Sequence, residues 1–272
     1  MTWAQLGSEP SAALGAARTA LHHAVQIVAA AGETFVPARP DTSQNASVWI
    51  ESHAALGGAE LPARFPCRVA LRVADLTLLL LDRQGAPHAE LALAGRPPDA
   101  AKEWAADAIR SHTQGELARA LVAPGFEIPG VLPRFPAPDA ALAELGRWYA
   151  AADYELGALA ARTPGAGPVL CWPHHLDIAS LIELGGERTI GVGLSPGDDG
   201  TAEPYLYVNH FPASSTHPLP PLEAGAWHTI GWLGALLRGS ELVAAGDAAA
   251  QQALWRRFVA SAIAASRKLV GA

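Results

Sequence analysis

The sequence has few cysteines, no cluster of basic residues and no long apolar run. Its two cysteines, Cys67 and Cys171, are too few for the disulfide framework of a small secreted protein. Its Lys and Arg residues are scattered and the formal net charge is -7. Because nucleic-acid binding needs a basic face that neutralises phosphates, we expect no nucleic-acid partner.

Signals for export and for membrane insertion are also missing. Residues 1–6 have no basic stretch followed by an apolar run, as a secretory signal would. The longest strongly apolar run, Leu76 to Leu81, is far shorter than the ~20 residues of a spanning helix. We therefore expect a soluble, cytoplasmic protein without a membrane partner, and the sequence leaves its oligomeric state open.

No complete catalytic or nucleotide-binding motif is present, and HExxH, CxxC, P-loop and EF-hand patterns do not occur. Residues 193–197 (GLSPG) match the G-x-S-x-G nucleophile elbow, which needs a following helix and a backbone N–H after the serine. Pro196 has no N–H. The third glycine of a dinucleotide fingerprint beginning at Gly191 would also fall at Pro196. These residues therefore predict a hairpin turn.

The first half predicts a helix, four strands and further helices. Apolar residues at three- and four-residue steps predict a helix over 11–31, which Ser11 caps and Gly32 ends. Arg18, His22 and Gln26 fall on its other face. Strands are expected at 48–50, 68–73, 76–81 and 89–93, then a helix from Asp99, a second helix from a Thr113–Glu116 capping box to Val122, and a proline-rich connection at 124–138.

The second half repeats this order in outline. A helix over 142–159 is followed by strands at 168–172, 177–184, 189–194 and 204–209, a proline-rich loop at 212–221, a helix near 231–245 and a last helix from an Asp247 cap to Val270. Because strands follow one another without helices between them, antiparallel pairing is expected. The fold class is thus α+β, a mostly antiparallel sheet flanked by helices.

We expect a single compact domain over residues 1–272. A further hypothesis is an internal duplication of a helix–four strands–helix unit, with pseudo-repeats at 1–130 and 131–272. Residues 48–53 and 170–175 would then be equivalent first strands.

The residues that could carry chemistry lie between Cys171 and Glu241. Pro173 favours an extended conformation at Trp172, so residues 171–177 are predicted as a strand. Alternation then places His175 and Asp177 on one face and His174 on the other. Such a pair could share a metal ion, or Asp177 could orient the imidazole of His175. The alternative is a hydrogen-bonded core histidine beside an aspartate that caps a turn.

Two more segments add aromatic and polar side chains. Residues 203–209 form a return strand with Tyr205 and Tyr207 on one face and Glu203 at its start. Residues 227–234 place two tryptophans, a histidine and two glycines together, which favours a small-ligand pocket. Asp198 and Asp199, at the tip of the hairpin, are typical turn residues. The alternative for these segments is a tryptophan-rich core with no ligand.

Four of these segments resemble a family of uncharacterised bacterial proteins, a domain of unknown function. They are residues 171–179 (CWPHHLDIA), 191–198 (GVGLSPGD), 203–208 (EPYLYV) and 227–235 (WHTIGWLGA). The family often has an aromatic residue where this chain has Leu176 and Leu206, so a pocket lined there would differ in shape. No activity or catalytic residue carries over. The resemblance implies only that residues from about 168 to 245 form one unit.

Three functions stay open. The first is a small-molecule binding protein, or an enzyme of unknown reaction, with a pocket formed by Trp172, His174, His175, Asp177, Tyr205, Trp227, His228 and Trp232. The second is a hydrolytic enzyme with a divalent metal ion held by His175, Asp177, Glu203 and His228. The third is a non-catalytic structural or interaction protein. A metal is the one cofactor that the sequence leaves open.

Overall fold

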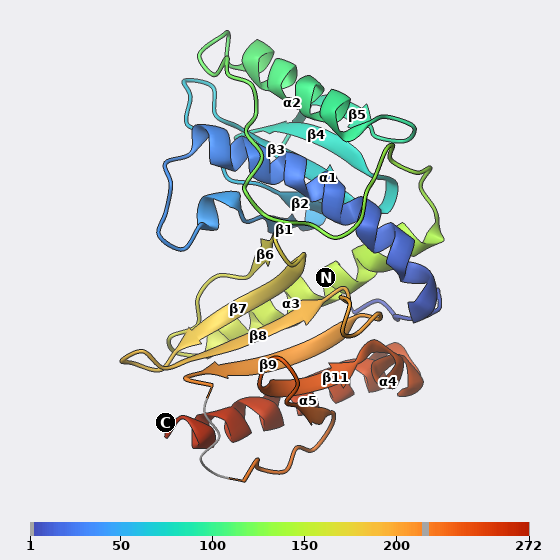
Figure 1. Cartoon of the computed structure of the whole chain (residues 1–272), viewed down its shortest axis with the longest axis vertical. Coiled ribbons are helices and arrows are strands. Elements are labelled where there is room, and N and C mark those ends of the chain that lie inside the picture. Colours follow the sequence, from blue (N-terminus) through green and yellow to red (C-terminus); the bar gives the residue numbers. More distant parts are fainter. Residues whose placement is uncertain (1–2, 214–217, 272) are drawn as a thin grey trace. The chain divides into compact units, whose positions relative to one another are not determined.

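The computed structural model describes residues 3–213 and 218–271 and divides the chain into two compact units, which we describe separately (Figure 1). Unit 1 comprises Met1–Gly15, Arg147–Val169 and Asp177–Ala272, and unit 2 comprises Ala16–Gly146 and Leu170–Leu176. Each unit has an antiparallel sheet and helices, so the predicted α+β class is confirmed. Residues 1–2 of the N-terminal segment and 214–217 of the predicted loop lie outside the described residues.

Unit 2 contains a five-stranded antiparallel sheet in which every strand pairs with the next one along the chain. The strands are β1 (Val48–Ile50), β2 (Ala55–Gly57), β3 (Cys67–Arg72), β4 (Thr77–Asp82) and β5 (Pro87–Ala92). The leucines of β4 are buried on both faces, as the continuous apolar run predicts for an inner strand. Helix α2 (Pro98–His112) packs on β3, β4 and β5.

The long helix α1 (Leu14–Phe35) follows a 3-10 turn at Ser11–Ala13 and does not end at Gly32. A Cβ atom at Gly32 would lie 2.0 Å from the carbonyl oxygen of Gln44. The glycine therefore permits a close backbone approach within the helix, and the prediction that it terminates the helix was wrong.

The capping box predicted at Thr113 and Glu116 does not form. Thr113 is the C-terminal cap of α2, where its hydroxyl donates to the carbonyl oxygen of Ile109 over 2.8 Å. The Glu116 carboxylate accepts from the backbone N–H of Arg64 over 2.9 Å. Residues 114–122 are not helical, and the Thr113 hydroxyl accepts from the N–H of Leu117 over 3.2 Å, one residue beyond the partner that a capping box requires. The connection at 124–138 lacks helix and strand, as its prolines predict.

Unit 1 contains strands in the order β10-β11-β9-β8-β7. Their bounds are β7 (Asp177–Glu183), β8 (Thr189–Ser195), β9 (Tyr205–Phe211), β10 (Ala226–His228) and β11 (Gly234–Arg238). The helix expected near 231–245 is mostly wrong, since 234–238 is a strand and only α4 (Gly239–Ala244) is helical. Pairing of β11 with β9 outweighs local helix preference there. The internal duplication remains a prediction. The two sheets differ in strand order, because β11 lies between β9 and β10, whereas β1 to β5 follow chain order.

One face of this sheet is apolar and packs against helix α5 (Ala248–Leu269), which contacts β8, β9 and β11. Eight side chains of this face are at most 1% exposed: Ile178, Ile182, Ile190, Val192, Leu194, Leu206, Val208 and Ala235. Helix α3 (Ala140–Arg162), which belongs to unit 1 from Arg147 onward, lies behind β7 and β8 in the view of Figure 1. The Asp247 carboxylate caps α5 by accepting from the N–H of Ala250 over 2.9 Å, as predicted.

The short strand β6 (Leu170–Trp172) is part of unit 2, where Cys171 forms an isolated bridge with Ser47. Residues 170–176, which the family resemblance groups with the segments that follow, are thus assigned to unit 2. Of the helices in the described residues, none is both long and apolar enough to span a membrane.

Candidate functional site

The face of the unit 1 sheet opposite α5, here called the open face, carries polar and aromatic side chains. Antiparallel register sets Gly193 beside Ala179 on one side and Tyr207 on the other. The strand residues of this face are Asp177, Ala179, Leu181 and Glu183 of β7, Thr189, Gly191, Gly193 and Ser195 of β8, Tyr205, Tyr207, Asn209 and Phe211 of β9, Gly234, Leu236 and Arg238 of β11, and Ala226 and His228 of β10. Arg238 is thus the cross-strand neighbour of Tyr205.

Three glycines let large side chains lie flat on the open face. Asn209 lies over Gly191, Tyr207 over Gly193 and Trp232 over Gly234. A Cβ at Gly193 would be 2.6 Å from the ring carbon Cζ and hydroxyl of Tyr207. Glycine within a strand often marks a close approach of another group, and here that group is the chain's own aromatic ring. The glycines therefore leave room for the tyrosine and the tryptophan.

Two tyrosine–aspartate pairs stand side by side on β9 and its neighbours. The hydroxyl of Tyr207 donates to Oδ2 of Asp177, whose side chain belongs to a residue only 9% exposed. The hydroxyl of Tyr205 donates to Oδ2 of Asp198 over 2.6 Å. The two tyrosine rings are 6.4 Å apart between centroids. Two carboxylates are thus each held by the hydroxyl of a tyrosine, and the two tyrosines are neighbours on one strand.

The two carboxylate oxygens of Asp198 accept hydrogen bonds from different parts of unit 1. Its Oδ1 accepts from the backbone N–H groups of Gly200 and Thr201 over 2.8 and 2.7 Å, which forms the hairpin turn expected after Pro196. Its Oδ2 remains directed at Tyr205. The sequence predicted the turn, and the second contact depends on the return strand.

The surroundings of Tyr205 are electrostatically negative. Burial is the largest cause that raises the pKa of its hydroxyl far above the usual value of 10, and the bond to Asp198 adds to it. The charges of Asp198 and Asp177 raise the pKa further, and a hydrogen bond with Ser195 opposes them. Both carboxylates therefore act on the same small region.

Trp232 and His228 lie at the edge of the open face. The Trp232 ring meets the Tyr207 ring edge-on, with centroids 6.4 Å apart and planes at 78°. The His228 ring is 4.5 Å from Trp232, and its Nε2–H donates to the carbonyl oxygen of Ile230 over 2.7 Å. That bond fixes the imidazole in the loop before β11. His228 therefore supports the tryptophan.

Trp227 does not join this group. It neighbours Ala235 in the sheet and lies on the apolar face, where its ring meets that of His210 at a centroid distance of 6.4 Å. Its indole N–H donates to the carbonyl oxygen of Pro220 over 2.7 Å. Alternation along the short strand β10 separates it from His228.

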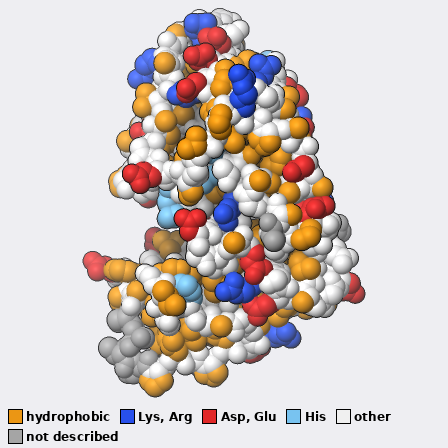
Figure 2. Space-filling view, turned by 45° about the vertical axis from the view of Figure 1, so that its right-hand side comes forward, with side chains coloured by type: hydrophobic (Ala, Val, Ile, Leu, Met, Phe, Trp, Pro, Cys, Tyr) orange, Lys and Arg blue, Asp and Glu red, His pale blue; other side chains and the backbone are white. Residues whose placement is uncertain are grey.

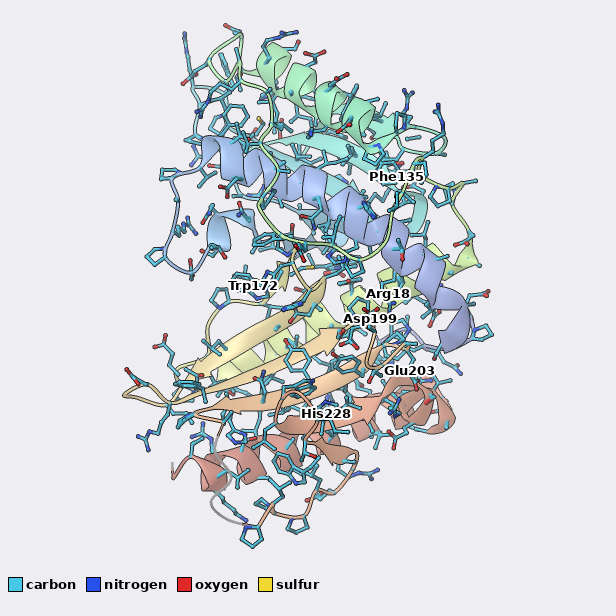
Figure 3. The ribbon with its side chains drawn as sticks, in the orientation of Figure 1. Arg18, Phe135, Trp172, Asp199, Glu203 and His228 are labelled. Carbon is cyan, nitrogen blue, oxygen red and sulfur yellow. The ribbon has the colours of Figure 1, made fainter. Side chains whose placement is uncertain are left out.

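Glu203 is used inside unit 1 in another way (Figure 3). Its carboxylate accepts from the backbone N–H and the hydroxyl of Ser240 over 2.6 and 3.1 Å and lies 3.6 Å from the guanidinium of Arg238. These bonds tie the hairpin to α4. In the described part of the chain, no three His, Cys, Asp or Glu side chains come together as metal ligands would.

The other three candidate residues, Trp172, His174 and His175, belong to unit 2. Residues 173–176 form a turn closed by the bond from Leu176 N–H to the Trp172 carbonyl over 2.7 Å, and Leu176 has a φ of 57°. The strand alternation predicted for His174, His175 and Asp177 was therefore wrong, because the chain reverses between the histidines and the aspartate.

The turn is held by residues of α1 that sequence reasoning did not select. The side chains of His22 and Gln26 both donate to the carbonyl oxygen of Pro173, over 2.9 and 2.6 Å. The available signal was the polar spacing Arg18, His22, Gln26 on an otherwise apolar helix, which is four residues at each step. Burial is the main cause that lowers the pKa of His22, and nearby positive groups lower it further.

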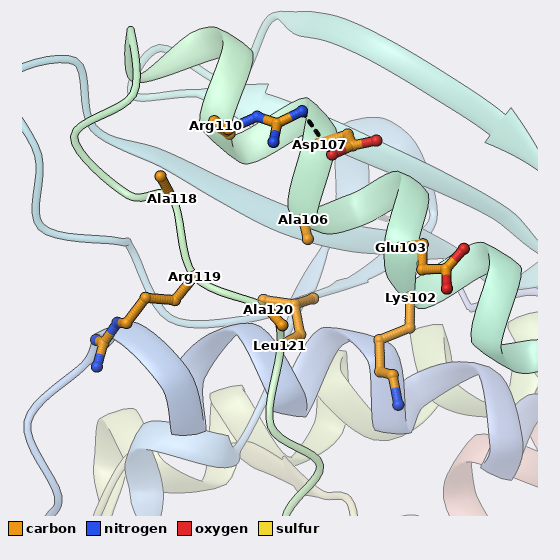
Figure 4. A pocket seen from close by; sticks show the side chains of 9 residues that line it. All are labelled: Lys102, Glu103, Ala106, Asp107, Arg110, Ala118, Arg119, Ala120 and Leu121. Atoms are coloured by element: carbon orange, nitrogen blue, oxygen red, sulfur yellow. Dashed lines mark ion pairs between the residues drawn. The ribbon is translucent and has the colours of Figure 1, made fainter.

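Unit 2 also has a cavity of about 490 Å³ between α2 and residues 118–121 (Figure 4). Its floor contains Ala106, Ala120 and Leu121, and its rim is charged. Most of the rim charges have partners: Arg110 pairs with Asp107 over 2.9 Å, Lys102 lies 3.3 Å from Asp99, and Arg119 donates to the Thr34 carbonyl over 2.6 Å. We therefore assign the cavity no function.

Charged side chains of both signs are scattered over the face of the molecule drawn in Figure 2, with apolar and neutral atoms between them.

Comparisons with protein-family models, with curated proteins and with solved structures find no match for this chain. Any functional assignment therefore rests on the geometry described above.

Proposed function

We propose that this protein binds a small organic cation, such as a protonated amine or a quaternary ammonium compound, on the open face of unit 1. The observation that carries the proposal is the pair of tyrosine–aspartate contacts on β9, Tyr207 with Asp177 and Tyr205 with Asp198. The rings of Tyr207 and Trp232 adjoin them. Carboxylates and aromatic faces together are the usual means of recognising such cations.

The local charge favours a cation over an anion. Asp177 and Asp198 both raise the pKa of the Tyr205 hydroxyl, which indicates that their negative fields overlap. The basic residue of β11, Arg238, lies beside Glu203 at 3.6 Å and is thereby partly neutralised. A cation held between the two carboxylates would offset their mutual repulsion, and a tryptophan face would add about 0.5–2 kcal/mol.

The segments that carry the family resemblance supply most of this face, since residues 177–179, 191–198, 203–208 and 227–235 contribute its strands and loop. We propose that the proteins that share these segments bind ligands with the same chemistry. The geometry favours this function over a metal-dependent hydrolase. Glu203 and His228 each have hydrogen-bond partners of their own, and the described residues contain no group of three potential metal ligands.

Binding can be measured by tryptophan fluorescence of the full chain with phenethylamine and choline as probes and phenylacetate as an anionic control. We expect saturable quenching by the amines and none by phenylacetate. Asp177→Asn should weaken amine binding at least tenfold, because it removes a buried negative charge. The matched control is Asp199→Asn, an exposed aspartate of the hairpin tip, which should leave binding unchanged.

Two results would contradict the proposal. Equal quenching by phenylacetate and phenethylamine would show that charge does not select the ligand. Absence of binding by both amines, with the folded state verified by circular dichroism, would favour the structural role that the sequence left open. Amine binding by Tyr207→Phe is a second measurement, since this variant lacks the hydroxyl bonded to Asp177 and keeps the aromatic ring.

A further inference from the structure

A second group of polar side chains, within unit 2, lies where α1 holds the turn at residues 173–176. We call it the α1–turn cluster and define it as Arg18, His22, Gln26, His174 and His175. Arg18, His22 and Gln26 stand four residues apart and so share one face of the helix (Figure 3 labels Arg18). His22 is only 7% exposed. Burying such groups is unfavourable unless each finds a partner.

Part of the cluster is satisfied internally. Gln26 and His22 donate to the Pro173 carbonyl, and because a carbonyl only accepts, Nε2 of His22 carries a proton. These two bonds fix the turn on the helix. The turn in consequence presents His174 and His175 side by side, with ring centroids 4.5 Å apart. His174 is further held against the ring of Phe126 at 5.2 Å.

Another part is not satisfied. Among the described residues, Nη1 of Arg18 and Nδ1 of His174 are buried and have no hydrogen-bond partner. An unpartnered buried donor of a charged group is more unfavourable than one of a neutral group. Buried polar atoms of this kind call for a missing partner, and a guanidinium N–H can be satisfied only by an acceptor.

The charges of the cluster have one sign. Arg18 and His175 both lie close enough to His22 to disfavour its protonation, and His175 acts on His174 in the same sense. No acidic side chain contributes to the shift of either imidazole. The cluster therefore gathers one permanent and three potential positive charges, and only basic groups are found among the charges that act on His22 and His174.

We propose that the α1–turn cluster binds an oxyanion, the phosphate or carboxylate group of a small ligand, with the guanidinium of Arg18 and the imidazole of His174 as its donors. An arginine fork matches both oxyanions, and an anion would supply the acceptor that both atoms lack. His175, which is exposed, lies beside His174 and adds a further donor at the solvent side. The proposal does not rest on the cation site proposed for unit 1, because it uses other residues.

The test uses the full chain and follows the imidazole signals of His174 and His22 by NMR during titration with inorganic phosphate, acetate and chloride. We expect saturable shifts with phosphate or acetate, and none with chloride at matched ionic strength. A response to phosphate alone assigns a tetrahedral ligand group, and a response to acetate alone assigns a carboxylate.

Arg18→Gln should weaken binding of the effective anion at least tenfold, and Arg18→Lys should weaken it less, because it keeps the charge and loses the fork. The control is Arg110→Gln on α2, whose arginine pairs with Asp107. Thermal melts without anion verify that each variant folds, and His174→Asn provides a second variant if Arg18→Gln does not. Absence of saturable shifts with both oxyanions, or unchanged binding by Arg18→Gln, would overturn the proposal.

Discussion

Replacing Gly193 with alanine tests the geometry of the open face most directly. A Cβ at this position would lie 2.6 Å from the ring carbon Cζ and from the hydroxyl oxygen of Tyr207 and 2.8 Å from Cβ of Ala179, far inside normal contact distance. Gly193 is on the inner strand β8, between β7 and β9, so the backbone has little freedom to move. The tyrosine ring must therefore be displaced from Asp177.

The expected change in the free energy of unfolding combines two destabilising effects with one stabilising effect. Overpacking at a well-packed position costs about 1–3 kcal/mol, and loss of a hydrogen bond to a charged group costs about 1.5–3 kcal/mol. The two share one ring movement, so they do not add in full. Removing a glycine restricts the unfolded chain and returns about 0.4–1 kcal/mol. We expect a net destabilisation of about 2 kcal/mol.

The assay is urea denaturation of the full chain followed by circular dichroism. With a slope of about 2 kcal/mol per M, the midpoint should fall by about 1 M. The matched control is Gly157→Ala in the interior of α3, where an added Cβ meets no atom within 4 Å. There the same substitution should stabilise by about 0.5–1 kcal/mol, because alanine favours the helix.

The two variants are thus expected to change stability in opposite directions. If Gly193→Ala raised the urea midpoint as Gly157→Ala does, the space beside Gly193 would be empty and Tyr207 could not lie across it. The arrangement of the two tyrosine–aspartate pairs, and the cation site built on them, would then be refuted.

Two further predictions concern titratable groups. Burial lowers the pKa of His22 and of His210 from the usual 6.5, so stability should be level above about pH 7 and should fall below about pH 6.5, where the unfolded chain takes up protons that these imidazoles resist. Each unit of lowering is worth about 1.4 kcal/mol, and urea midpoints that rose from pH 7 to pH 5 would contradict this. Burial also raises the pKa of the Cys67 thiol to about 11, and Cys171 is fully buried. Ellman's reagent at pH 8 should therefore react slowly with the native protein and with two thiols after unfolding, and rapid reaction of the native chain would be inconsistent with this burial.

Much of the fold follows from local sequence pattern. Apolar periodicity located α1, α2, α3 and α5, and alternation located the strands from β3 to β9 to within a few residues. The predictions failed where a side chain or glycine had a distant partner. Thr113 and Glu116 form no capping box, since Thr113 bonds back to Ile109 and Glu116 to Arg64, and Gly32 lies inside α1, where it leaves room for the Gln44 carbonyl.

The predictions for the candidate site likewise succeeded where local chemistry decided the structure and failed where a distant partner decided it. Pro196 was sufficient to exclude a serine elbow and a dinucleotide fingerprint, because a missing N–H is a property of the residue itself. The turn at 173–176, in contrast, was predicted as a strand. Its conformation depends on the donors that His22 and Gln26 supply from α1, about 150 residues earlier in the chain.

The sequence by itself determined the α+β class, the position of most elements and the region richest in polar aromatic residues, because periodicity and residue chemistry act over a few neighbours. Only the tertiary structure decided which of those residues meet. Strand register paired Tyr207 with Asp177 and placed Trp227 on the opposite face from His228. Tertiary packing brought His22 and Gln26 against the Pro173 carbonyl, whereas their local spacing showed only that they share a helix face. Register and packing depend on contacts between distant segments, so no local window of sequence contains them.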